Sequence, residues 1–98
     1  MEKTSLQKLQ HWYASRCNGA WEQTYGLAIE TIDVPGWRVT IDLEETGLSE
    51  AGFQEVKQHA EGEPHYIHCK VKNNQFIGLC APMKLEETVK IFLDWTEM

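Results

Sequence analysis

The 98-residue sequence lacks an apolar run of the roughly 20 residues that a membrane-spanning helix needs. Basic residues are also few, since nine Lys and Arg stand against 15 Asp and Glu and the net charge is −6. A protein that binds nucleic acid or anionic lipid presents a basic face to neutralise phosphate groups. We therefore expect neither a nucleic acid nor a membrane as the partner of this chain.

Cysteine is scarce, and the three that occur, Cys17, Cys69 and Cys80, form no CxxC pair. An odd, widely spaced set fits reduced thiols in a bacterial type of cytosol better than a disulfide framework. The first residues, Met1 to Ser5, are polar and do not begin the apolar core of an export signal. The expected localisation is therefore cytoplasmic.

Familiar catalytic motifs are missing as well. The sequence has no glycine-rich phosphate loop, no GxSxG elbow and no HExxH zinc motif. A zinc site needs three or four convergent ligands. His65 and Cys69 share one face of a predicted strand, but His68 points to the other face. We therefore expect no metal and no cofactor.

None of the three thiols is placed for catalysis. A nucleophilic cysteine needs a nearby cation, a histidine or a helix N-terminus to lower its pKa. Cys17 closes a predicted helix instead of beginning one, and Cys69 and Cys80 point toward the predicted core, where thiols are usually inert. The sequence thus predicts no catalytic residue and a protein that is not an enzyme.

What the chain does contain is enough apolar material for an ordered core, 42% of its residues with four Trp among them. No repeat or linker divides it, so we predict one domain over residues 1–98. Thr4 and Gln7 form a capping-box pattern that begins a helix running to Cys17, and Asn18-Gly19 follows as its end. The apolar stripe expected to face the core comprises Leu6, Leu9, Tyr13 and Cys17, with Trp12 beside it.

Two predicted strands, 25–30 and 37–43, alternate apolar and polar residues on either side of the turn Asp33-Val34-Pro35-Gly36. The apolar residues of both strands have odd numbers. They can lie on one face of the hairpin only if the residue numbers of each cross-strand pair add up to an even number. A two-residue loop at Pro35-Gly36 would pair odd with even numbers. We therefore predict a bulge or an odd-length loop in this hairpin.

The segment Glu44–Glu63 is expected to form a loop and then a polar edge strand from Phe53 to about His59, with a short helix over Leu48–Ala60 as the alternative. A second hairpin, with strands 65–72 and 75–80, is predicted around Asn73-Asn74, because Asn tolerates the positive φ of a two-residue turn. Its register pairs Val71 with Phe76, Cys69 with Gly78 and Ile67 with Cys80.

A last helix is predicted from Leu85 to about Glu97, without a good N-cap. The fold class is α+β: a two-layer sandwich of one antiparallel sheet of four or five strands, with the N-terminal and C-terminal helices packed on one face. Ile77 and Leu79 make strand 75–80 apolar on both faces, which favours a central position. The expected core comprises Tyr13, Leu85, Val89, Phe92 and Trp95 against Leu27, Val39, Ile41 and Val71.

Acidic residues gather on the first predicted hairpin and its ends, at Glu30, Asp33, Asp42, Glu44 and Glu45. Solvation explains most such charges, and a surface complementary to a basic partner is the functional alternative. Trp12 and Trp21 lie off the clear core stripes. For each of them two roles remain open: a packed corner of the core, or an exposed anchor at an interface.

The first 43 residues carry a distinctive string: WYASRCNGAWE at residues 12–22, Tyr25-Gly26, TIDVPGW at residues 31–37 and Ile41-Asp42-Leu43. This pattern resembles the immunity protein 53 family of bacterial polymorphic toxin systems, and a looser likeness continues through Phe76-Ile77-Gly78 to Trp95. The chain departs from the family pattern at residues 78–84, where a glycine-rich loop and an Asn cap would precede the last helix.

The resemblance implies a non-catalytic protein that binds and neutralises a cognate toxin domain in the cell that makes it. Many secreted toxin domains are basic nucleases, and a small acidic protein is suited to bind one. The candidate toxin-binding residues are Trp21, Tyr25, Glu30, Asp33, Asp42 and Glu44. Two alternatives remain: a small thiol-dependent enzyme similar to a sulfurtransferase, and a general protein-interaction module.

Overall fold

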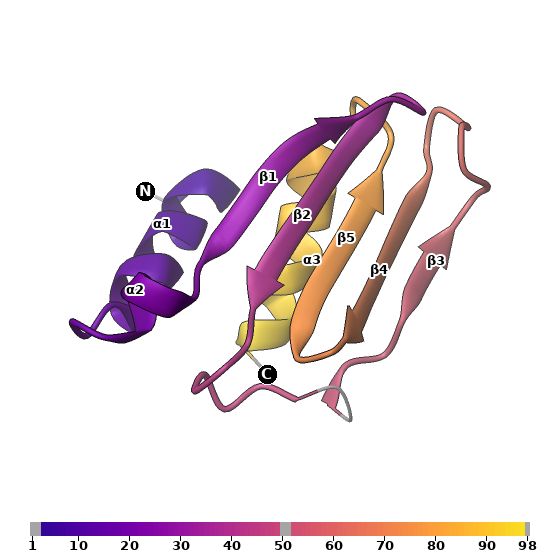
Figure 1. Ribbon diagram of the computed structural model, residues 1–98. Helices are drawn as coiled ribbons and strands as arrows, with labels where there is room; N and C mark the ends of the chain where they lie inside the picture. The colour runs from indigo at the N-terminus through magenta and orange to yellow at the C-terminus, as the bar shows by residue number, and fades with distance from the viewer. Residues whose placement is uncertain (1–2, 50–51, 98) are drawn as a thin grey trace.

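Five strands form one antiparallel sheet in the order β1-β2-β5-β4-β3, with α1 and α3 on one face (Figure 1). The computed structural model describes residues 3–49 and 52–97. The predicted α+β fold, with one antiparallel sheet and a helix near each end of the chain, is confirmed. The elements are α1 (Ser5–Arg16), α2 (Trp21–Thr24), β1 (Leu27–Ile32), β2 (Gly36–Asp42), β3 (Val56–Gln58), β4 (Ile67–Lys72), β5 (Gln75–Cys80) and α3 (Leu85–Thr96).

The predicted capping box begins α1. Thr4 Oγ1 accepts a hydrogen bond from the Gln7 N–H at 3.1 Å, and Gln7 Oε1 accepts one from the Thr4 N–H at 2.9 Å. These two bonds satisfy backbone donors that the first turn of a helix otherwise leaves free. The helix ends at Arg16, one residue before the predicted Cys17, whose backbone is extended.

The apolar stripe predicted for α1 is wrong in part. Leu9 is buried, but Leu6 is 62% exposed and Tyr13 is 39% exposed, so Tyr13 is not a core residue. The reason is that α1 packs against α3, where the ring of Trp12 meets the ring of Phe92 edge to face at 4.9 Å, instead of lying flat on β1. The side of α1 that carries Leu6 and Tyr13 is therefore left uncovered.

The register predicted for the first hairpin is confirmed. Leu27 lies opposite Ile41, and Ile32 lies opposite Gly36, so the loop has the odd length of three residues, 33–35. Its Val34–Pro35 peptide bond is cis. β1 begins at Leu27, two residues later than predicted, because residues 21–24 form the unexpected short helix α2.

The second hairpin also matches its prediction pair by pair, with Ile67 opposite Cys80 and Val71 opposite Phe76. Asn73 and Asn74 adopt positive φ angles of 53° and 61°, as a two-residue turn requires. β5 lies between β2 and β4, the central position that its two apolar faces indicate.

The expected edge strand is present but short. β3 pairs with β4 and falls inside the predicted strand from Phe53 to about His59. The alternative helix over Leu48–Ala60 is not formed by residues 53–60, while residues 50 and 51 of that segment lie outside the described residues. The preceding loop is tied to α3, because Trp95 Nε1 donates to the Gly52 carbonyl oxygen at 2.9 Å.

The core lies between the sheet and α3. Phe92 is fully buried, and its ring meets Phe76 of β5 at 5.1 Å. Lys84 gives α3 no side-chain cap, as expected, and Leu85 is only partly buried, contrary to its predicted core role. The buried residues of α3 are Thr88, Val89, Phe92, Leu93 and Trp95.

Gly78 of β5 permits this close approach, so Gly78→Ala should destabilise the fold. A Cβ atom at this position would lie 2.6 Å from Thr88 Cγ2 and 3.2 Å from Phe76 Cε1. We expect the free energy of unfolding to fall by about 1–3 kcal/mol, measured by urea denaturation. Gly26→Ala is the control, because a Cβ there meets no atom within 4 Å. An equal decrease in the free energy of unfolding of both variants would contradict this account of the packing at Gly78.

Candidate functional site

Among the residues that the structure describes, no helix lies on the face of the sheet that points away from α1 and α3, and we call this face the open face (Figure 1). Alternation along the strands assigns its residues, because successive side chains point to opposite faces. The open face comprises Ala28, Glu30, Ile32, Arg38, Thr40, Asp42, Lys57, His68, Lys70, Lys72, Gln75, Ile77 and Leu79.

The centre of the open face is apolar. Ile77 lies between Thr40 of β2 and Lys70 of β4 in the register, and Leu79 lies between Arg38 and His68. Ile77 and Leu79 are only half-buried, although they belong to the central strand. An apolar centre within a polar rim is the usual arrangement of a protein–protein interface.

The rim is charged and holds both signs. Arg38 Nη1 lies 3.5 Å from Glu30 Oε1, with both side chains about half exposed. His68 Nε2 lies 2.7 Å from Glu55 Oε2, and this hydrogen bond lowers the pKa of the Glu55 carboxyl group. Lysines of β3 and β4 add positive charge on the far side of the face from β1.

Asp42 anchors the end of the first hairpin. Its Oδ2 accepts a hydrogen bond from the Gly26 N–H at 3.0 Å, and its Oδ1 accepts one from Gln75 Nε2 at 2.8 Å. A shallow hollow of about 330 Å³ opens beside these groups, and Tyr25 and Thr40 are among the residues that line it. Asp42 is therefore both a structural acceptor and part of the open face.

The structure divides the six candidate toxin-binding residues. Glu30 and Asp42 lie on the open face, and Tyr25 lines the hollow beside Asp42. Asp33 is exposed in the hairpin loop at the other end of β1. It lies seven positions after Gly26 in the chain, which at about 3.3 Å per position of a strand is roughly 23 Å. The set therefore spans the length of the hairpin and forms no compact cluster.

Trp21 lies in the interior, with only 2% of its surface exposed. Its Nε1 donates to the backbone carbonyl oxygen of Glu44 at 2.7 Å, which ties α2 to the end of β2. The rings of Trp12, Tyr13 and Tyr25 each lie 6.2 Å from it. Of the two alternatives left open for Trp21, the packed corner is the one observed, and the same ring contacts make Trp12 a packing residue.

The distinctive string at residues 12–22 has a structural role that the sequence reasoning missed. Asn18 Oδ1 accepts hydrogen bonds from the N–H groups of Ala20 and Trp21 at 2.9 Å. The Glu22 carboxylate accepts from Asn18 and Gly19. Hydrogen bonds from backbone N–H groups of Glu22 itself, Asn18 and Gly19 lower its pKa. Asn18 thus accepts from the first backbone N–H of α2, although the N-cap residue is Ala20, whose side chain forms no capping bond.

The thiols are not arranged for catalysis. Cys69 and Cys80 are fully buried, and burial, with a smaller effect of Cys80, raises the pKa of Cys69 to about 12. Cys17 is exposed, and its Sγ lies 3.3 Å from the Tyr13 carbonyl oxygen. In the described ranges, no three His, Cys, Asp or Glu side chains gather to hold a metal ion. Within those ranges no helix has the length and apolar character to span a bilayer.

Iodoacetamide should therefore label Cys17 alone in the folded protein at neutral pH. The thiolate is the reactive form, and Cys69 stays protonated until the pH approaches about 12. Because its pKa is raised on folding from 9.0, the folded state retains the proton longer, so stability should decline as the pH rises above about 9. Mass spectrometry of Cys17→Ser, expected to remain unlabelled, is the control. Labelling of Cys69 without unfolding would contradict the assignment.

Comparison with known proteins identifies the family of this chain. No curated protein and no solved structure matches the chain. The family described as immunity protein 53 matches residues 6–97, which is nearly the whole sequence and includes every helix and strand except the first residue of α1. The resemblance seen in the sequence is confirmed, and the chain belongs to the immunity protein 53 family.

Proposed function

We propose that this protein is a non-catalytic immunity protein that binds a cognate toxin domain in the bacterial cytoplasm and thereby blocks it. The observation that carries the proposal is the family match over residues 6–97. The buried state of Cys69 and Cys80 speaks against the thiol-dependent alternative. A general interaction module has no separate observation in its favour.

The open face is the surface that we propose for the toxin. Ile77 and Leu79 supply apolar contact area at its centre, where interfaces gain most of their binding energy. The surrounding side chains are polar or charged and can fix the orientation of the partner. Tyr25 adds an aromatic side chain with a polar tip at the edge of this face.

Charge indicates the chemistry of the partner. The segment Leu27–Glu45 carries five acidic side chains and only Arg38 as a cation, a net charge of −4 within a chain of −6. On the open face, β1 and β2 contribute Glu30, Asp42 and Arg38, a net charge of −1, and Asp33, Glu44 and Glu45 add acidic charge at the ends of the hairpin. This side of the protein therefore suits a basic partner, such as a basic nuclease domain. The lysines of β3 and β4 suit an acidic patch on that same partner, and this division of charge would set the orientation of binding.

The function is tested by co-expression with a candidate toxin domain, chosen from a large secreted protein encoded next to this gene. We expect the protein to restore growth, and we expect a stable complex with the toxin to purify from those cells. The control is the same toxin expressed with the Ile77→Asp variant, which places a charge at the centre of the open face and should weaken rescue while the far-ultraviolet circular dichroism stays unchanged. Growth without any complex would contradict a binding mechanism.

The charge proposal is tested with a Glu30→Lys and Asp33→Lys double variant. Both side chains are exposed, so folding should be preserved, and the association rate with the toxin should fall about tenfold at low salt. Stopped-flow fluorescence measures this rate. The matched control is Asp94→Lys with Glu97→Lys, which makes the same change of charge on α3, away from the open face. Equal slowing by both pairs would indicate a net-charge effect and contradict this interface.

A further inference from the structure

The two edges of the sheet differ in how they are protected against pairing with another strand. β3 is three residues long and contains Lys57, and short, charged edge strands resist pairing. β1 is six residues long and contains no Pro, Lys or bulge, and it pairs with β2 at six consecutive positions. The one charged side chain of β1, Glu30, is paired with Arg38 of β2. β1 therefore presents a regular edge with few of the devices that proteins use to block strand addition.

The hydrogen bonds of the first hairpin determine which backbone groups of β1 face outward. The Asp42 N–H donates to the Gly26 carbonyl oxygen at 2.9 Å, so Gly26 directs its backbone acceptor toward β2. Backbone groups alternate in direction along an antiparallel strand. Leu27, Ile29 and Thr31 therefore direct their N–H and C=O groups away from β2, toward the free edge.

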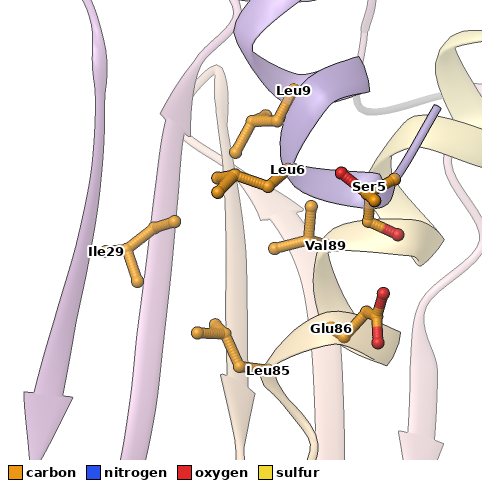
Figure 2. A pocket seen from close by; sticks show the side chains of 8 residues that line it. Ser5, Leu6, Leu9, Ile29, Leu85, Glu86 and Val89 are labelled. Carbon is orange, nitrogen blue, oxygen red and sulfur yellow. The ribbon is translucent and has the colours of Figure 1, made fainter.

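An apolar groove of about 240 Å³ lies beside this edge on the helix side of the sheet. Figure 2 shows Leu6 and Leu9 of α1, Ile29 of β1 and Leu85 and Val89 of α3 around the same space. Leu6 is 62% exposed and Ile29 is 36% exposed. The sequence pattern of α1 indicated burial for Leu6, yet the single chain does not provide it.

We propose that two copies of this chain associate through their β1 strands, which pair antiparallel about a two-fold axis at Ile29. In this register Ile29 of one copy faces Ile29 of the other, and Leu27 faces Thr31. Every outward N–H and C=O group of the three residues then has a partner. The two five-stranded sheets become one continuous sheet of ten strands.

The register is selective for a second copy. It places Ala28 opposite Glu30, so the acidic side chain meets a methyl group. A shift of two residues in one direction brings Glu30 opposite Glu30, and like charges opposite one another destabilise a sheet. A shift in the other direction leaves Thr31 facing Tyr25, which lies before β1 begins. The strand is thus complementary to itself in one register.

Packing favours the same arrangement. Leu6 and Ile29 line one groove, so an axis at Ile29 also brings the Leu6 side chains of both copies together on the helix side. Among the described residues that line the groove, Glu86 is the one with a charged side chain. A two-fold axis perpendicular to the sheet leaves both open faces on one side, free for other partners. The proposal does not depend on the identity of a toxin or on the function proposed above.

The purified full chain tests the proposal without any toxin. Sedimentation velocity from low to high micromolar concentration should show a monomer–dimer equilibrium. The Ile29→Lys variant places two like charges on the axis and should raise the dissociation constant at least about tenfold. Leu6→Lys should act in the same direction. Gln58→Lys is the matched control, because it adds the same charge on the helix side of the opposite edge strand, and it should leave the equilibrium unchanged.

Amide hydrogen exchange distinguishes this pairing from any other dimer. Protection at Leu27, Ile29 and Thr31 should rise with protein concentration, whereas Ala28 and Glu30, which pair with β2, should be protected at all concentrations. A monomer at high concentration would overturn the proposal, as would a dimer without protection at the three outward amides. Protection that appears only when a toxin is added would also overturn it, in favour of a strand of the toxin as the occupant.

Discussion

The contact between Phe92 and Phe76 holds the two layers of this protein together. Phe92 extends from α3 and Phe76 from the central strand β5, both are fully buried, and their rings lie 5.1 Å apart. Gly78 allows α3 to approach, because any Cβ there would strike Thr88. α1 then attaches to α3 through Trp12, which meets the same Phe92 ring. The position of both helices thus depends on one aromatic residue.

That arrangement also decides which surfaces stay free. The single helix α3 covers β2, β5 and β4, and α1 packs against it, so β1 has little cover (Figure 1). No helix of the described part of the chain lies on the opposite face of the sheet. The open face combines an apolar centre with a charged rim, and the β1 edge combines free backbone groups with an apolar groove. Two different modes of association are therefore available, one through side chains and one through backbone hydrogen bonds.

Local chemistry made much of the fold predictable. The Thr4–Gln7 capping box and the Asn73-Asn74 turn each depend on residues close in the chain, and both are present. Parity alone predicted a bulge or an odd-length loop in the first hairpin, and the loop has three residues. The prediction that the apolar stripe of α1 is buried was wrong in part. Periodicity shows that a helix has an apolar side, but it does not show which neighbour covers that side. α2 was missed because its four residues are too few to show a period, and the side chain of its N-cap residue, Ala20, forms no capping bond.

The sequence by itself determined the family, the order of elements and both hairpin registers, because motifs, turns and alternation act over a few residues. It also placed a net charge of −4, out of −6 for the chain, on the segment Leu27–Glu45. Only the tertiary structure decided that Trp21 is interior, that Asp42 is held by Gly26 and Gln75, and that Leu6 and the β1 edge are uncovered. Those outcomes depend on contacts between segments far apart in the chain, such as the one from Trp21 to Glu44, and no local pattern specifies them.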